Sequence, residues 1–134
     1  MGENGLLTRD AILSAADLRH ERVEVPEWGG AVLVWTMTGE EKDAFEQAQF
    51  LAHGTDERVN LKHYRARLVV FTVRDEAGQR LFSPADITEL ARKAAIALDR
   101  IVPVAHRLNA LTAATTEELR KNYAAEPGDG STSA

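Results

Sequence analysis

The sequence predicts an α+β fold, mostly helical, in which a short N-terminal helix and a β-hairpin pack against about four helices. Val23 and Val25 alternate with charged residues, and residues 32–37 are rich in strand-forming types, so this region predicts the hairpin. Helix-capping residues ahead of apolar runs predict the helices. The combination of one hairpin with several helices places the chain in the α+β class.

The N-terminal part of the domain is predicted to form a helix and then the hairpin. The Thr8 hydroxyl is suited to cap a helix that runs through about Asp17, with Ile12 and Leu13 as its apolar contacts. The hairpin turn is predicted between the strands, where Pro26 and the pair Gly29–Gly30 lie, because glycine tolerates the positive φ that such turns require.

The middle of the chain is predicted to hold two helices. Thr38 and Glu41 have the spacing of a capping box, in which each side chain accepts a hydrogen bond from the backbone amide of the other. This helix is expected to reach about His53, where a glycine follows and ends it. The second helix is expected from about Asn60, but residues 68–73 fit a helix and a strand equally well.

The longest helix is predicted to open at Ser83 and Pro84, since serine caps helices and proline is favoured in their first turn. It is expected to continue to about Leu111. Pro103 lacks an amide proton and clashes with the preceding turn, so we expect a kink or a break there. The apolar stripe of this helix consists of Ile87, Leu90, Ala94, Leu98, Ile101, Ala105 and Leu108.

A single domain is expected over residues 6–123, which fits a total length of 134 residues. Residues 1–5 are few and rich in glycine. Residues 124–134 contain proline, glycine and serine but no large apolar side chain. Both ends are therefore predicted to be disordered, because they bury too little surface to offset the entropy cost of ordering.

The composition excludes several classes of protein. The absence of cysteine excludes disulfide frameworks, thiolate zinc sites, iron–sulfur clusters and cysteine nucleophiles. The net charge is -5 and the basic residues are scattered, so no nucleic-acid partner is expected. The N-terminal residues lack a signal-peptide pattern and no apolar run approaches the ~20 residues that span a bilayer. We therefore expect a cytoplasmic protein with no membrane partner.

No motif points to catalysis, to a metal or to a cofactor. The four histidines show no metal-ligand spacing, no serine lies in a nucleophile motif, and no glycine-rich phosphate loop is present. The acidic residues within 40–46 are explained by capping and by solvation. The basic stretch 62–68 is better explained by salt bridges on a helix surface than by nucleic-acid binding. The sequence predicts that the protein is not an enzyme.

Phe50 and Trp28 are two of the aromatic residues that are candidates for contact with a partner protein. Phe50 projects away from the apolar face of its predicted helix, among polar neighbours. It either packs under the following loop or is exposed to a partner. Trp28, at the expected hairpin tip, either packs against the nearest helix or anchors a partner. Both alternatives remain open for both residues.

The order of several segments resembles the tail assembly chaperones of long-tailed phages and prophages, the siphovirus type. The resemblance covers roughly residues 6–123, and VPEWGG, TGEEKDAFE and VRDEAGQRLF carry most of it. The segments, in order, are LTRDAIL, VEVPEWGGAVLVW, MTGEEKDAFE, LVVFTVRDEAGQRLF and a helix ending in AHRLNALT.

The resemblance implies a protein that works through transient protein contacts and needs no cofactor. Proteins of this family bind the tape measure protein, a very long, helical and partly apolar chain, and keep it soluble while tail-tube subunits polymerise around it. Many also exist in a longer form made by programmed ribosomal frameshifting, whose added part recruits tail-tube protein. The resemblance further implies action in the host bacterial cytoplasm and absence from the mature virion.

The partner-binding residues that we predict are Trp28, Trp35 and Phe50, because the apolar stripe of the longest helix is expected to be claimed by the core. The sequence leaves a homo-oligomer open as well. The alternative interpretation is a head–tail connector or a tail terminator, a structural protein that forms a stable ring and stays in the virion.

Overall fold

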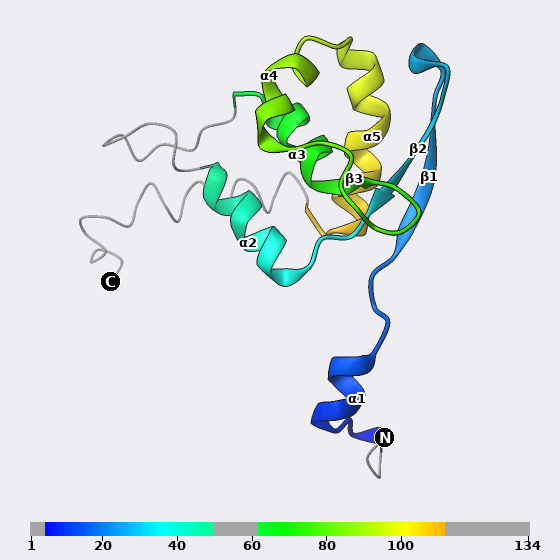
Figure 1. Cartoon of the computed structure of the whole chain (residues 1–134), viewed down its shortest axis with the longest axis vertical. Coiled ribbons are helices and arrows are strands. Elements are labelled where there is room, and N and C mark those ends of the chain that lie inside the picture. Colours follow the sequence, from blue (N-terminus) through cyan, green and yellow to red (C-terminus); the bar gives the residue numbers. More distant parts are fainter. Residues whose placement is uncertain (1–4, 50–61, 112–134) are drawn as a thin grey trace, which may run out of the picture.

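A computed structural model describes residues 5–49 and 62–111 of the chain. It contains a short N-terminal helix, three antiparallel strands and several further helices, which confirms the predicted α+β class. The helices after the hairpin gather beside the sheet, whereas the N-terminal helix extends away from them (Figure 1). Residues 1–4 and 124–134 lie outside the described residues.

The predicted hairpin is confirmed. Strands β1 (His20–Val25) and β2 (Gly30–Trp35) are antiparallel and are joined by the 3-10 turn η2 (Pro26–Trp28). Gly29 has a φ of 79°, the left-handed conformation that glycine adopts without strain. The third strand, β3 (Val73–Arg74), pairs with β2. The sequence left a strand open only as one alternative for residues 68–73, because two residues are too few to show a strand pattern.

Helix α3 (Tyr64–Thr72) lies at the centre of the core and is buried on all sides from Ala66 to Thr72. It resolves the ambiguity of residues 68–73: the helix ends at Thr72 and strand β3 follows directly. An apolar run without a polar face gives no periodicity, so the sequence alone did not separate the two alternatives. The start that we expected near Asn60 lies outside the described residues.

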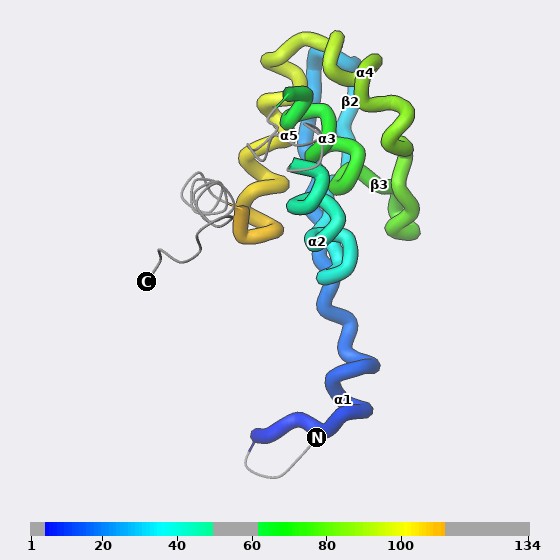
Figure 2. The backbone as a smooth tube through the Cα atoms, turned by 90° about the vertical axis from the view of Figure 1, so that its left-hand side faces the viewer, coloured from blue at the N-terminus to red at the C-terminus, as the bar shows by residue number. Residues whose placement is uncertain are grey.

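The prediction of one long helix from Pro84 to Leu111 is wrong. The segment forms the turn η3 (Pro84–Asp86), the short helix α4 (Ile87–Leu90) and helix α5 (Ala95–Leu108), with a turn at residues 91–94 between the helices. Both helices pack against α3, and Figure 2 shows how the chain reverses between them. An unbroken helix would carry one half away from the core, so burial favours the break.

Of the kink or break expected at Pro103, the break is wrong, because this residue lies inside the continuous helix α5. Pro103 is on the exposed side of the helix. The carbonyl of Asp99, which loses its helical partner, therefore faces water instead of the core. The opposite side of α5 packs against β1 and β2 and buries Ala97, Leu98, Ile101 and Ala105.

The two predicted helix caps in the first half of the chain are confirmed. The Thr8 hydroxyl accepts a hydrogen bond of 3.2 Å from the Ala11 amide and caps α1 (Arg9–Ser14), which ends before Asp17. The capping box of α2 (Gly39–Ala48) is complete, as described below. The part of this helix predicted beyond residue 49 lies outside the described residues.

Candidate functional site

Among the described residues, exposed large apolar side chains are concentrated in residues 6–18. Of the large apolar side chains that are exposed within residues 5–49 and 62–111, only Leu81 and Ile96 lie elsewhere. We call residues 6–18 the N-terminal arm. Its exposed apolar residues are Leu6, Leu7, Ile12, Leu13 and Leu18, with exposed fractions from 44% to 69%.

The arm forms a short capped helix, but this helix buries none of its side chains among the described residues. Leu7 and Ile12 occupy the two positions of a hydrophobic staple around the Thr8 cap. None of the residues of α1 is buried within the described part of the chain. The expectation that Ile12 and Leu13 supply contacts to the domain is therefore wrong: residues 15–19 carry α1 away from the helices (Figures 1 and 2).

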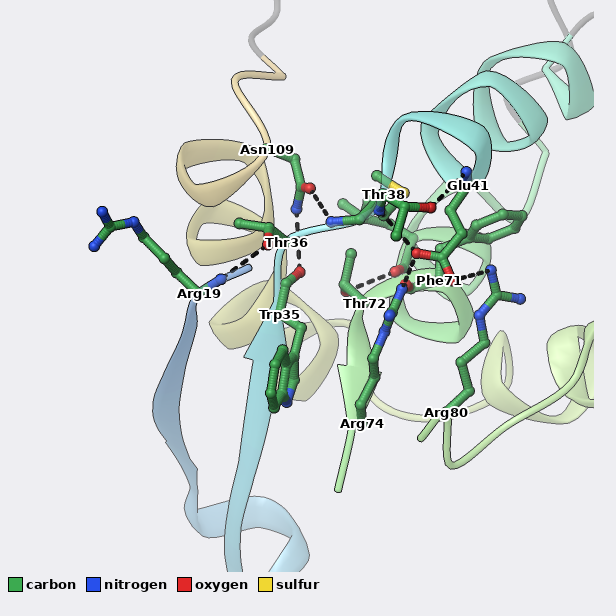
Figure 3. Close-up of polar contacts among 12 residues, drawn as sticks. Arg19, Trp35, Thr36, Thr38, Glu41, Phe71, Thr72, Arg74, Arg80 and Asn109 are labelled. Carbon is green, nitrogen blue, oxygen red and sulfur yellow. Dashed lines mark hydrogen bonds and ion pairs between the residues drawn. The ribbon is translucent and has the colours of Figure 1, made fainter. Parts of the chain in front are cut away.

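The base of the arm is attached to the end of the hairpin. The Arg19 amide donates a hydrogen bond of 3.0 Å to the Thr36 hydroxyl, and the Thr36 amide donates one of 2.9 Å to the Arg19 carbonyl (Figure 3). Leu18 and Met37 line a hollow of about 320 Å³ at this junction. The arm therefore projects from a fixed point of the sheet.

Trp28 lies half-buried at the other end of the hairpin. It lines an open hollow of about 250 Å³ together with Phe82 and Leu90, and charged residues surround this apolar floor. The carboxylate of Glu27 accepts two hydrogen bonds of 2.7 Å from the Arg100 guanidinium, which holds the pKa of Glu27 below its ordinary value. This ion pair fixes the hairpin tip to α5.

Trp35 lies half-buried on the outer side of β2, and its ring stacks on His20 with 4.3 Å between the ring centroids. The turn at Gly78 covers the other part of the ring, since a Cβ atom there would lie 3.6 Å from it. Its indole nitrogen is buried and has no hydrogen-bond partner within the described residues. Phe50, the third predicted contact residue, lies outside them.

Comparison with known proteins places the chain in a family. Residues 7–122, most of the chain, match the phage tail assembly chaperone family. This protein is a member of that family. A solved structure titled "Structure of bacteriophage HK97 tail assembly chaperone" superposes with a TM-score of 0.52 at 22% identity, over 74% of this chain and 90% of that one, so the two share a fold. No curated protein matches the sequence.

The charged residues near the centre of the chaperone hold its elements together. Glu41 Oε1 accepts hydrogen bonds from the Thr38 amide at 2.9 Å and from the Arg74 guanidinium at 2.8 Å, and Arg80 lies 3.6 Å from the other oxygen (Figure 3). Burial raises the pKa of Glu41, but Thr38 and Arg74 outweigh it and hold the pKa below its ordinary value. Glu41 therefore forms a structural ion pair with Arg74, in addition to the capping role that the sequence predicted.

The basic stretch 62–68 is divided between surface and core. Arg65 forms the predicted kind of surface salt bridge, with 2.6 Å to Asp99. Arg67 departs from the prediction of salt bridges on a helix surface, because it is buried and donates to the Gln49 side chain and the Lys62 carbonyl. Burial lowers the pKa of Arg67. The stretch thus anchors α3 and does not present a continuous basic surface.

The described residues contain neither a group of three metal-ligating side chains nor a helix that is long and apolar enough to cross a membrane. Their most unusual surface is the arm, which sequence reasoning missed as a binding candidate. The sequence does contain an indication of this surface, since large apolar residues are frequent in residues 6–18. An amphipathic pattern alone does not tell whether the domain itself covers such residues.

Proposed function

We propose that this tail assembly chaperone binds the tape measure protein of its phage and keeps it soluble until tail-tube subunits assemble around it. The match of residues 7–122 to the chaperone family carries this proposal. The exposed apolar arm supports it, because a chaperone for an apolar chain needs apolar surface that its own core does not use.

The same proposal includes release before the virion is complete, action in the host cytoplasm, and recruitment of tail-tube protein by a longer frameshifted form. Trp28, Trp35 and Phe50 remain proposed contact residues for the tape measure protein. The half-buried position of Trp28 beside an apolar hollow is consistent with an anchoring role.

Co-expression tests this function. The tape measure protein from the same genome is produced with and without the chaperone, and its soluble yield and co-elution on size exclusion are measured. We expect tape measure protein that is insoluble alone to become soluble and to co-elute with the chaperone. Unchanged solubility without co-elution, with this chain and with any longer form, would refute the proposal.

Purified virions provide the second test, because the alternative head–tail connector or tail terminator stays in the particle. We expect mass spectrometry of mature virions to find no stoichiometric amount of this chain. Detection of one ring or more per particle would favour the structural alternative over the chaperone.

A further inference from the structure

We propose, building on the proposed function, that the N-terminal arm is a further surface, besides Trp28, Trp35 and Phe50, that holds the tape measure protein. The arm packs its exposed leucine and isoleucine side chains against an apolar stripe on a helix of the tape measure protein. The contact residues are Leu6, Leu7, Ile12, Leu13 and Leu18.

The concentration of exposed apolar residues carries the inference. Leu81 and Ile96 are single exposed residues of the kind that most protein surfaces have. The arm instead presents five within 13 residues, on a segment that projects away from the helices (Figure 1). Apolar side chains gathered in this way are typical of a surface that another molecule covers.

The backbone of the arm decides how a partner can bind it. Residues 9–14 are helical, and the Thr8 hydroxyl satisfies the Ala11 amide. A partner therefore contacts α1 through side chains rather than by adding a strand. A helix with an apolar stripe fits, because it presents side chains and not a free strand edge. A helix as short as α1 is marginal alone, so docking would also stabilise it.

The charge of the arm argues against phosphate-bearing partners. Arg9 is paired with Asp10 at 3.0 Å, and Asp17 adds one negative charge. Membrane-surface helices and nucleic-acid arms carry an excess of lysine and arginine instead. The arm is therefore suited to an apolar protein surface.

The size of the arm favours a contact that can be released. Stable interfaces involve about 20–30 residues on each side. The arm has 13 residues, so the arm by itself forms a smaller contact than these. A small apolar contact suits a partner that must later be handed over to the tail tube.

The test compares two matched double variants of the full-length chaperone. Leu7→Gln with Leu13→Gln removes two arm contacts whose side chains are 59% and 67% exposed. Leu81→Gln with Ile96→Gln removes residues that are 53% and 59% exposed elsewhere. Neither pair changes the charge. Each variant is co-expressed with the tape measure protein, and co-elution, the mass of the free chaperone and its thermal unfolding midpoint are measured.

We expect the affinity of the arm variant for the tape measure protein to fall about tenfold or more, since each leucine is a separate apolar contact. Its unfolding midpoint and its mass should match those of the wild type. The control variant should bind normally. Failure of the wild type to bind, both as this chain and as any longer form, would refute the proposed function itself.

Three results would overturn the inference while the proposed function stands. The first is normal binding by the arm variant, or an equal loss in the control variant. The second is a lower mass of the free arm variant, which would show that a second copy covers the arm. The third is a lower unfolding midpoint of the arm variant, which would show that another segment of the same chain covers it.

Discussion

The guanidinium of Arg74 donates a hydrogen bond of 2.8 Å to the carboxylate of Glu41, and this contact joins strand β3 to the first turn of α2. Arg74 is 5% exposed, and its Nε atom has no partner within the described residues. The buried positive charge of Arg74 is therefore stabilised by Glu41 and by the Phe71 carbonyl, to which Arg74 also donates a hydrogen bond of 2.8 Å. One carboxylate thus caps a helix and compensates a buried charge.

Replacement of Glu41 should destabilise the chaperone strongly. Glu41→Ala removes the charge partner of Arg74 and opens the capping box, so we expect the free energy of unfolding to fall by about 3 kcal/mol or more. Denaturant unfolding followed by circular dichroism measures this change. Glu40→Ala is the matched control, because Glu40 is exposed in the same turn and its loss should cost less than about 1 kcal/mol. Equal effects of the two variants would contradict the assignment.

Asn109 should be the main polar link between the end of α5 and the end of the hairpin. Its side-chain oxygen accepts from the Met37 amide at 2.6 Å, and its nitrogen donates to the carbonyls of Ala105 and Trp35. Asn109→Ala leaves the buried Met37 amide without its acceptor, so we expect a loss of about 1–3 kcal/mol in unfolding free energy. Faster hydrogen exchange at the Met37 amide would locate the effect. An unchanged unfolding midpoint would show that the link contributes little.

Two glycines should respond differently to alanine. Gly78 has a φ of 86°, and the added methyl group would lie 3.6 Å from the Trp35 ring, an ordinary contact distance. The backbone conformation alone should therefore make Gly78→Ala cost about 1 kcal/mol. Gly30 has no unusual φ and open space around it, so Gly30→Ala should be neutral within about 0.5 kcal/mol. Thermal unfolding of the two variants compares these costs, and a neutral Gly78→Ala would contradict the expected strain.

Mild acid should destabilise the chaperone through His106. Burial lowers the pKa of this imidazole below its ordinary value of 6.5, so the unfolded chain takes up the proton first as the pH falls. The stabilisation is complete above pH 6.5 and is lost as the pH falls through the folded-state pKa. We expect the unfolding midpoint to drop between pH 7.5 and pH 5.5.

The variant His106→Gln isolates this contribution, although it also alters the contact of 2.8 Å between His106 Nε2 and the Tyr64 hydroxyl. Its midpoint should be lower at pH 7.5 but should change less with pH than that of the wild type. Glu41 acts in a lower range, near and below its ordinary pKa of 4.5, because its pKa is also lowered on folding. An equal pH dependence in both proteins would exclude His106 as the source.

Short sequence patterns correctly predicted the elements that depend on interactions between neighbouring residues. The caps at Thr8 and Thr38 and the turn at Gly29 need only neighbouring residues, and all three are confirmed. The α+β class followed from the same signals. The break at residues 91–94 did not, because no residue there is a poor helix former and only packing against α3 makes the turn favourable.

The sequence by itself determined the α+β class, the hairpin, the two caps and the family resemblance, since these depend on side chains a few residues apart or on their order. Only the tertiary structure decided that Arg67 is buried, that Pro103 is tolerated and that residues 6–18 are left uncovered. The physical reason is that burial is a property of the whole packed domain. An apolar residue at helical spacing looks the same in the sequence whether its own core or another molecule covers it.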